Sequence, residues 1–254
     1  MYGKPQVNFE VKSLEDTINI FVSFLETDED LKFSSATYIA NHYNINLSEL
    51  QGKSLEQRKE IITNILTPIY NVKLNQMKNK IADYQQYWNE NAAKVCEQFE
   101  KIFKIGFKGI RQFTAYINLN PMCPRYLNDD SFDIYYINKP EDCFKTCVHE
   151  LIHFYWFQVW QEVFEDANPE TFECPHLEWL FSEIVVDPII YYSELNQFNF
   201  KQPAYAYFYN SKFKDENVIE FFRKLYRSNS LETFMEKGIK LLKDNEAEAR
   251  TLIR

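Results

Sequence analysis

The chain has 254 residues, of which 45% are hydrophobic, 26% charged and 17% aromatic. This composition is that of a globular protein with a ring-rich core, and the length suits one large domain or two small ones. The net charge of −9 and the isoelectric point near 5.1 offer no basic surface for nucleic acid or anionic lipid. The longest apolar run, at 151–160, is too short to cross a bilayer. We therefore expect neither a nucleic-acid nor a membrane partner.

The cysteines indicate a reducing compartment. They are odd in number, and no C-x-x-C pair suggests a structural zinc site. Buried thiols account for such a set, which consists of Cys96, Cys123, Cys143, Cys147 and Cys174. The first residues, 1–6, lack the apolar stretch of a signal peptide. These observations predict a soluble, cytoplasmic protein.

Helices are predicted throughout residues 1–108. Ser13 fits the N-cap of a first helix, and a second helical segment runs from about 30 to 43. A third begins at Ser54 and is expected to end before Pro68. The segment 70–104 contains no glycine or proline and keeps apolar residues at helical spacing, which predicts one long helix. We assign 1–108 to a helical N-terminal region.

Two strands are predicted after the long helix. Gly106 and Gly109 end the helix, and the apolar period then changes to alternation. The segment 112–119 places its apolar residues on one face, and 131–137 is a second β-rich segment. The fold class is therefore α+β and mostly helical, with a small sheet in a central region, 109–200, flanked by N- and C-terminal helices.

The chemistry of the chain centres on His149-Glu150-Leu151-Ile152-His153. Two histidines four residues apart share one face of a helix, because a turn takes about 3.6 residues. Both rings can then reach one zinc ion at about 2.0–2.1 Å. Glu150 lies about 100° further round the helix, beside the metal, where its carboxylate can take a proton from zinc-bound water.

A buried helix that carries two histidines by chance is the alternative. The helix around the motif is apolar nearly all round, which is typical of a buried helix. Two histidines and a glutamate inside it would be costly without partners. The context therefore favours zinc over the alternative.

A catalytic zinc takes three protein ligands and keeps an open position. No glycine and third histidine follow His153 closely, so the third ligand comes from further along the chain. The candidates are Glu162, Glu165, His176, Glu178 and Glu183. Glu183 is favoured, because Asp187 lies four residues later on the same helical face and can accept the free N–H of a ligand histidine. His176 and Glu178 are the main alternatives.

The segments 149–153 and 183–187, His-Glu-Leu-Ile-His and Glu-Ile-Val-Val-Asp, resemble the HExxH and ExxxD motifs of the gluzincin class of zinc metallopeptidases. The resemblance covers about a third of the chain. It implies that His149, His153 and Glu183 bind zinc. It also implies that Glu150 is the general base and acid, and that Asp187 is the outer partner of His149.

The same resemblance implies a zincin-like core. In such a core the long helix backs a sheet, and a strand at the sheet edge pairs with extended substrate. Either of the two predicted strands can form that edge, and the strand 132–137 is our choice. Because Pro188 directly follows Asp187, we expect the helix to kink or end there.

The predicted function is zinc-dependent hydrolysis of peptide bonds in a peptide or protein substrate, with Glu150 moving the proton to the leaving amine. A non-catalytic zincin-like domain used for binding or regulation is the alternative. A deformylase-like amidase is less favoured, because the upstream cysteine motif of deformylases is missing.

A tyrosine is expected to stabilise the oxyanion, a task that zinc alone performs poorly. Tyr155 lies on a different face of the motif helix from the metal. The candidates are Tyr191 and Tyr192, with Tyr205, Tyr207 and Tyr209 in an alternating segment that is extended if it is a strand. Ordinary aromatic packing is the alternative for each of them. The remaining region, 201–254, is predicted to be helical, with Ser230 and Asp244 as N-caps.

Overall fold

The computed structural model describes residues 2–26 and 34–253, and the chain forms two compact units. Unit 1 consists of Met1–Pro5, Ala92–Arg111 and Val148–Arg254, and unit 2 of Gln6–Asn91 and Gln112–Cys147. The division at residues 108 and 200 stays a prediction. The α+β, mostly helical class is confirmed. Within the described residues, no helix is both long and apolar enough to cross a membrane.

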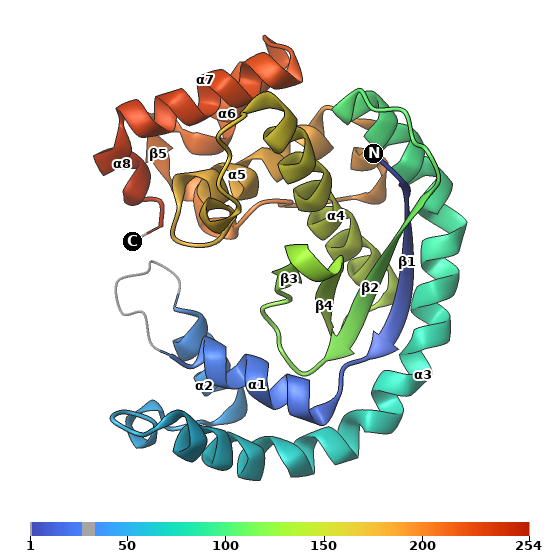
Figure 1. Ribbon diagram of the computed structural model, residues 1–254, viewed down its shortest axis with the longest axis vertical. Coiled ribbons are helices and arrows are strands. Elements are labelled where there is room, and N and C mark those ends of the chain that lie inside the picture. The colour runs from blue at the N-terminus through green and yellow to red at the C-terminus, as the bar shows by residue number, and fades with distance from the viewer. Residues whose placement is uncertain (1, 27–33, 254) are drawn as a thin grey trace. The chain divides into compact units, whose positions relative to one another are not determined.

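Unit 2 is built on a four-stranded mixed sheet, whose residues belong to this unit except for the first two of β1 and of β2. The strand order is β1-β2-β4-β3, and the strands are β1 (Lys4–Val11), β2 (Ile110–Asn118), β4 (Ser131–Tyr135) and β3 (Arg125–Tyr126) (Figure 1). β4 is parallel to β2 and antiparallel to β3. The two predicted strands are therefore confirmed, and β1 is an additional one.

The expectation that the strand 132–137 forms a sheet edge is wrong. β4 lies between β2 and β3, so the outermost strands of this sheet are β1 and β3 in the described chain. β3 pairs with Ser131 and Phe132, and the Asp133 N–H donates to the Pro124 carbonyl at 2.9 Å. All five residues of β4 are buried. Continuous burial is typical of an inner strand, whereas a half-exposed strand shows alternation.

The helices of unit 2 are α1 (Leu14–Phe24), α2 (Ser35–Tyr43), the first part of α3 (Leu55–Phe103) and the start of α4 (Pro140–Val163), with short 3₁₀ turns η1 (Leu47–Glu49) and η2 (Leu127–Asp129). The Ser13 hydroxyl accepts the Asp16 N–H at 3.0 Å, so the predicted N-cap is confirmed. The start of the second predicted helix, at 30–33, lies outside the described residues.

The long helix is confirmed, but the break expected before Pro68 is wrong. α3 continues through Pro68 as one helix of 49 residues. Proline removes one backbone hydrogen bond and crowds the preceding turn. Ile62, Leu66 and Tyr70, all buried, keep the same helical spacing on both sides of it. Packing of this apolar stripe therefore outweighs the local cost of the proline.

Unit 1 contains the end of α3, most of α4 and the C-terminal helices. The helices are α4 (Pro140–Val163), α5 (Leu177–Tyr191), α6 (Val218–Arg227), α7 (Leu231–Asp244) and α8 (Glu246–Arg250). Between them lie η3 (Pro169–Phe172), η4 (Glu194–Phe198), η5 (Ala206–Asn210) and a short hairpin of β5 (Lys212–Phe213) and β6 (Glu216–Asn217). α5 contacts both α6 and α7 (Figure 1).

The predicted caps of the C-terminal region have different outcomes. Ser230 caps α7, because its hydroxyl accepts the Thr233 N–H at 3.2 Å. Asp244 is wrong as an N-cap: it is the last residue of α7, and Asn245 takes the cap position of α8. The region is helical from Val218 to Arg250, whereas 212–217 contain the strands β5 and β6.

A cluster of aromatic rings holds α4, α5, α6 and α7 together. The Phe181 ring of α5 lies 5.3 Å from Trp156 of α4, 5.5 Å from Phe222 of α6 and 5.2 Å from Phe234 of α7, measured between centroids. All four side chains are fully buried. The close approach of α7 depends on Gly238, because a Cβ there would lie 2.1 Å from the Phe181 ring.

Replacement of this glycine should therefore loosen unit 1. In Gly238→Ala the new methyl group has to displace a ring that its neighbours hold on several sides. Overpacking offset by the better helix propensity of alanine leaves a net loss of roughly 1–2 kcal/mol in the free energy of unfolding. Urea denaturation measures it. Gly106→Ala is the matched control, because no atom lies within 4 Å of the position that its methyl group would take. Equal stability of the two variants would contradict the packing argument.

Candidate metal centre

α4 presents His149 and His153 on one face. The helix begins at Pro140 with Glu141 and Asp142 in its first turn, as the preferences of helix N-termini favour. Every residue from Val148 to Trp160 is buried except His149 and Gln158. The two imidazole centroids lie 4.8 Å apart, which is the outcome expected for an i, i+4 pair.

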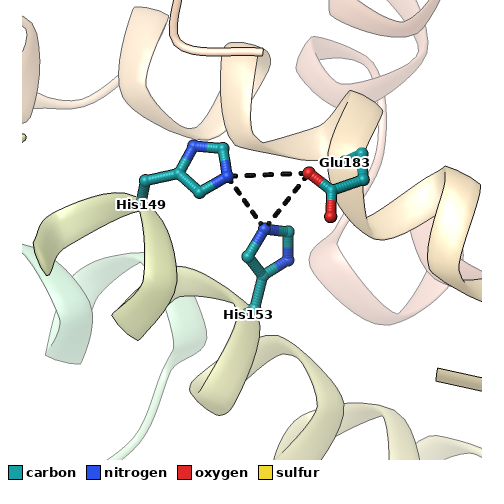
Figure 2. Close-up of side chains that lie close together, drawn as sticks. All are labelled: His149, His153 and Glu183. Carbon is teal, nitrogen blue, oxygen red and sulfur yellow. Dashed lines mark hydrogen bonds and ion pairs between the residues drawn. The ribbon is translucent and has the colours of Figure 1, made fainter. Parts of the chain in front are cut away.

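Glu183 of α5 completes a cluster of three possible ligands (Figure 2). The Nε2 atoms of His149 and His153 lie 3.1 Å apart. The Glu183 Oε2 atom lies 3.6 Å from Nε2 of His149 and 3.5 Å from Nε2 of His153. The His153 side chain is fully buried, that of Glu183 is 3% exposed and that of His149 is 23% exposed. His149 is therefore the most exposed of the three side chains.

These distances fit one metal ion. Three ligand atoms at about 2.0–2.1 Å from a tetrahedral zinc are about 3.3–3.4 Å from one another. The observed edges of 3.1, 3.5 and 3.6 Å enclose this range. Two imidazole nitrogens and one carboxylate oxygen are also a donor set that zinc accepts in catalytic sites. The residues present therefore fit the ion that the two motifs imply.

The hydrogen bond of His149 determines which ring nitrogen is available. Its Nδ1 atom lies 2.9 Å from the carbonyl oxygen of Pro203. A carbonyl only accepts, so Nδ1 carries the proton and donates it. In the neutral ring the lone pair is then on Nε2, the atom that faces Glu183 and His153.

The other candidate ligands lie elsewhere. Glu178 forms an ion pair with Lys243 at 2.8 Å, and His176 occupies the N-cap position of α5. Glu162 and Glu165 are exposed. Within the described residues, Glu183 is the acidic side chain that joins the two histidines in a metal-sized cluster.

Glu150 is 7% exposed and lies within electrostatic reach of the cluster. Burial lowers the pKa of His149, but the nearby carboxylates of Glu183 and Glu150 outweigh it, so the pKa is raised. Glu150 is thus next to the cluster without being one of its three members.

The predicted partnership of Asp187 with His149 is wrong. The Pro203 carbonyl takes the place beside His149 Nδ1. Asp187 is fully buried and accepts hydrogen bonds from Arg223, at 2.6 and 3.0 Å, and from the Tyr209 hydroxyl at 2.5 Å. Nor does the helix end at Pro188, since α5 runs to Tyr191.

The five candidate tyrosines separate into different roles. Tyr191 and Tyr192 are exposed; the first lies under the Arg223 guanidinium, 3.8 Å from its ring centroid, and the second stacks on Tyr226. The extended conformation considered for 202–210 is wrong, because 206–210 form the 3₁₀ turn η5.

Tyr207 has an electrostatic link to the cluster. Its pKa is raised first by burial and then by the negative charge of Glu183. Tyr205 stacks on Tyr207 with centroids 5.6 Å apart. The Tyr155 hydroxyl donates to the Gly3 carbonyl at 2.5 Å.

Two groups that contact Asp187 and His149 could not be recognised from the sequence. Arg223 is one of many basic residues in the C-terminal helices, and the Pro203 carbonyl belongs to the backbone. Neither belongs to a motif.

No protein-family model, curated protein or solved structure matches the chain significantly.

Loss of the ligand atoms should remove metal binding. Purified without added metal, the protein should contain one zinc per chain, and the double variant His149→Ala/His153→Ala should contain none. Glu183→Ala should retain both histidines but bind zinc far more weakly. Elemental analysis and competition with a chelator measure these outcomes. Glu165→Ala, on an exposed side chain, is the control. Stoichiometric zinc in the double variant would contradict the assignment of His149 and His153 as zinc ligands.

Proposed function

We propose that the protein is a zinc-dependent metallopeptidase with a gluzincin-type site on a zincin-like core. The observation that carries the proposal is the convergence of two histidine nitrogens and one carboxylate oxygen at edges of 3.1, 3.5 and 3.6 Å. The resemblance of 149–153 and 183–187 to the HExxH and ExxxD motifs supports the same class. His149, His153 and Glu183 hold the ion.

Zinc supplies a Lewis acid that acidifies water and polarises a carbonyl group. The residues around it supply the rest. Glu150 takes the proton of the attacking water and delivers it to the departing amine nitrogen, for which a carboxylate beside the ligands is suited. His149 is held by its donated hydrogen bond to Pro203, so its orientation does not depend on substrate.

Tyr207 is our proposed donor to the oxyanion. Burial and the Glu183 charge both raise the pKa of its phenol, so the hydroxyl keeps its proton and can only donate to a developing negative charge.

The substrate is a peptide or protein, and the protein is cytoplasmic. The five cysteines support this compartment, since all lie in the described chain and none forms a disulfide.

Glu150→Gln separates the general base from the ligands. The amide keeps the size of the side chain but cannot accept the proton, so zinc content and fold should be retained. Peptide cleavage should fall by about 100-fold or more. Digestion of a peptide library read by mass spectrometry measures activity, and elemental analysis measures zinc. Glu162→Gln, on the exposed face of the same helix, is the matched control.

Two results would contradict the proposal in different ways. Equal cleavage by Glu150→Gln and the parent would refute the role of Glu150. A zinc-loaded parent that cleaves no member of the library would refute the peptidase and favour the non-catalytic binding domain.

Tyr207→Phe tests the oxyanion donor. Removal of one such donor costs about 100–1,000-fold in kcat, while zinc affinity should be unchanged because the hydroxyl is not a ligand. Steady-state kinetics on the best peptide from the library measure the loss. Tyr192→Phe, on an exposed ring, serves as the control. If kcat of Tyr207→Phe stays within a factor of about two, the assignment fails.

A further inference from the structure

We propose that Tyr209 positions the metal ligand His149 through the backbone of Pro203 and Ala204, and that Asp187 and Arg223 hold Tyr209 in place. The inference rests on the proposed metal centre and deepens it. It gives the ExxxD aspartate an indirect role in place of the direct contact with histidine that the motif implies.

The first step is the contact between His149 and Pro203. The Pro203 carbonyl accepts the Nδ1 proton of His149 at 2.9 Å and thereby orients the ring. Pro203 lies between η4 and η5 in a stretch without helix or strand. No ladder or helical hydrogen bond therefore fixes the direction of this carbonyl, and another anchor is needed.

Tyr209 supplies that anchor. Its hydroxyl oxygen accepts the N–H of Ala204 at 3.3 Å, and this N–H belongs to the same peptide unit as the Pro203 carbonyl. Because a peptide unit is planar, holding its N–H also holds the direction of its C=O. The hydroxyl and His149 thus bind opposite edges of the same peptide unit.

Asp187 fixes the hydroxyl. Tyr209 donates to the Asp187 Oδ2 atom at 2.5 Å, and the direction of donation is settled because burial and Asp187 raise the pKa of the phenol. Asp187 is fully buried, and its own position is set by the fork of Arg223, whose Nε and Nη2 atoms lie 2.6 and 3.0 Å from its two oxygens.

The backbone of η5 is hydrogen-bonded to the start of α6, the helix that carries Arg223. The Asn217 amide donates to the Tyr209 carbonyl at 2.8 Å. Its oxygen accepts the N–H groups of Ile219 and Glu220 and so caps α6. The Tyr209 side chain is therefore bonded to Asp187 of α5, and its backbone is bonded to the N-cap of α6. Arg223 joins these two helices.

A purely structural role is the competing explanation. A buried ion pair between α5 and α6 could contribute only to folding, with Tyr209 as one more hydrogen-bond donor. Loss of that role would lower the free energy of unfolding without changing the orientation of the His149 ring. The positioning role makes His149 itself respond to the loss of one oxygen atom on Tyr209.

Tyr209→Phe removes that oxygen and leaves the Asp187–Arg223 pair intact. We expect the dissociation constant for zinc, measured by competition with a chelator, to rise about tenfold, as for loss of an outer partner of a metal ligand. Tyr226→Phe is the matched control, because Tyr226 packs against Phe234 and Tyr192 in the same unit. Its affinity for zinc should stay that of the parent.

A spectroscopic readout tests the orientation of the ring directly. In the zinc-loaded parent, the Nδ1 proton of His149 should give a slowly exchanging imidazole N–H resonance in the NMR spectrum, assigned by its absence from His149→Ala. In Tyr209→Phe this proton should exchange faster, and in Tyr226→Phe it should not. Arg223→Lys keeps the charge but loses the fork, and should shift both readouts in the direction of Tyr209→Phe.

The outcomes separate this inference from the proposed function. If the parent binds zinc and Tyr209→Phe keeps both its affinity and its protected N–H, the positioning role is overturned and the metallopeptidase proposal stands. A parent that binds no zinc would overturn both. If Tyr209→Phe does not fold, Arg223→Lys decides by the same two measurements.

Discussion

The burial of two carboxylates on one helix is the constraint on which the centre of unit 1 depends. Glu183 and Asp187 are both buried, four residues apart on α5. A buried carboxylate costs several kcal/mol unless positive charge or hydrogen-bond donors compensate it. Asp187 has a guanidinium fork and a tyrosine hydroxyl, whereas Glu183 faces two imidazoles. The neighbours of each carboxylate therefore decide its chemistry.

This difference separates one carboxylate that can bind a metal from one that cannot. The charge of Asp187 is matched inside the fold, so it serves structure and positioning. The charge of Glu183 meets ring nitrogens whose lone pairs favour a cation at the centre of the cluster. The aromatic rings around Phe181, two residues before Glu183, hold α5 against α4 and so hold the carboxylate at the histidines.

Much of the fold follows from local pattern. The long helix, the strands β2 and β4 and the helix α4 have strong periodicity and were predicted. The errors arise where tertiary packing outweighs a local rule. α3 continues through Pro68, because buried residues on both sides keep the helix packed. α5 also runs past Pro188 to Tyr191, so of the expected kink or end the end is excluded. The outer strand β3 is only two residues long, too short to show a recognisable pattern in the sequence. β4 was therefore wrongly expected at the edge of the sheet.

The sequence by itself determined the pair His149 and His153 and the adjacent Glu150, because an i, i+4 spacing on one helix is a local geometry that does not depend on the rest of the chain. It also favoured Glu183, through its spacing from Asp187. Only the tertiary structure decided that Glu183 meets the histidines while Asp187 meets Arg223, because that depends on how α5 packs against α4 and α6. The partner of His149 could not be predicted at all: a backbone carbonyl has no side chain, and its direction exists only once the chain around Pro203 has folded.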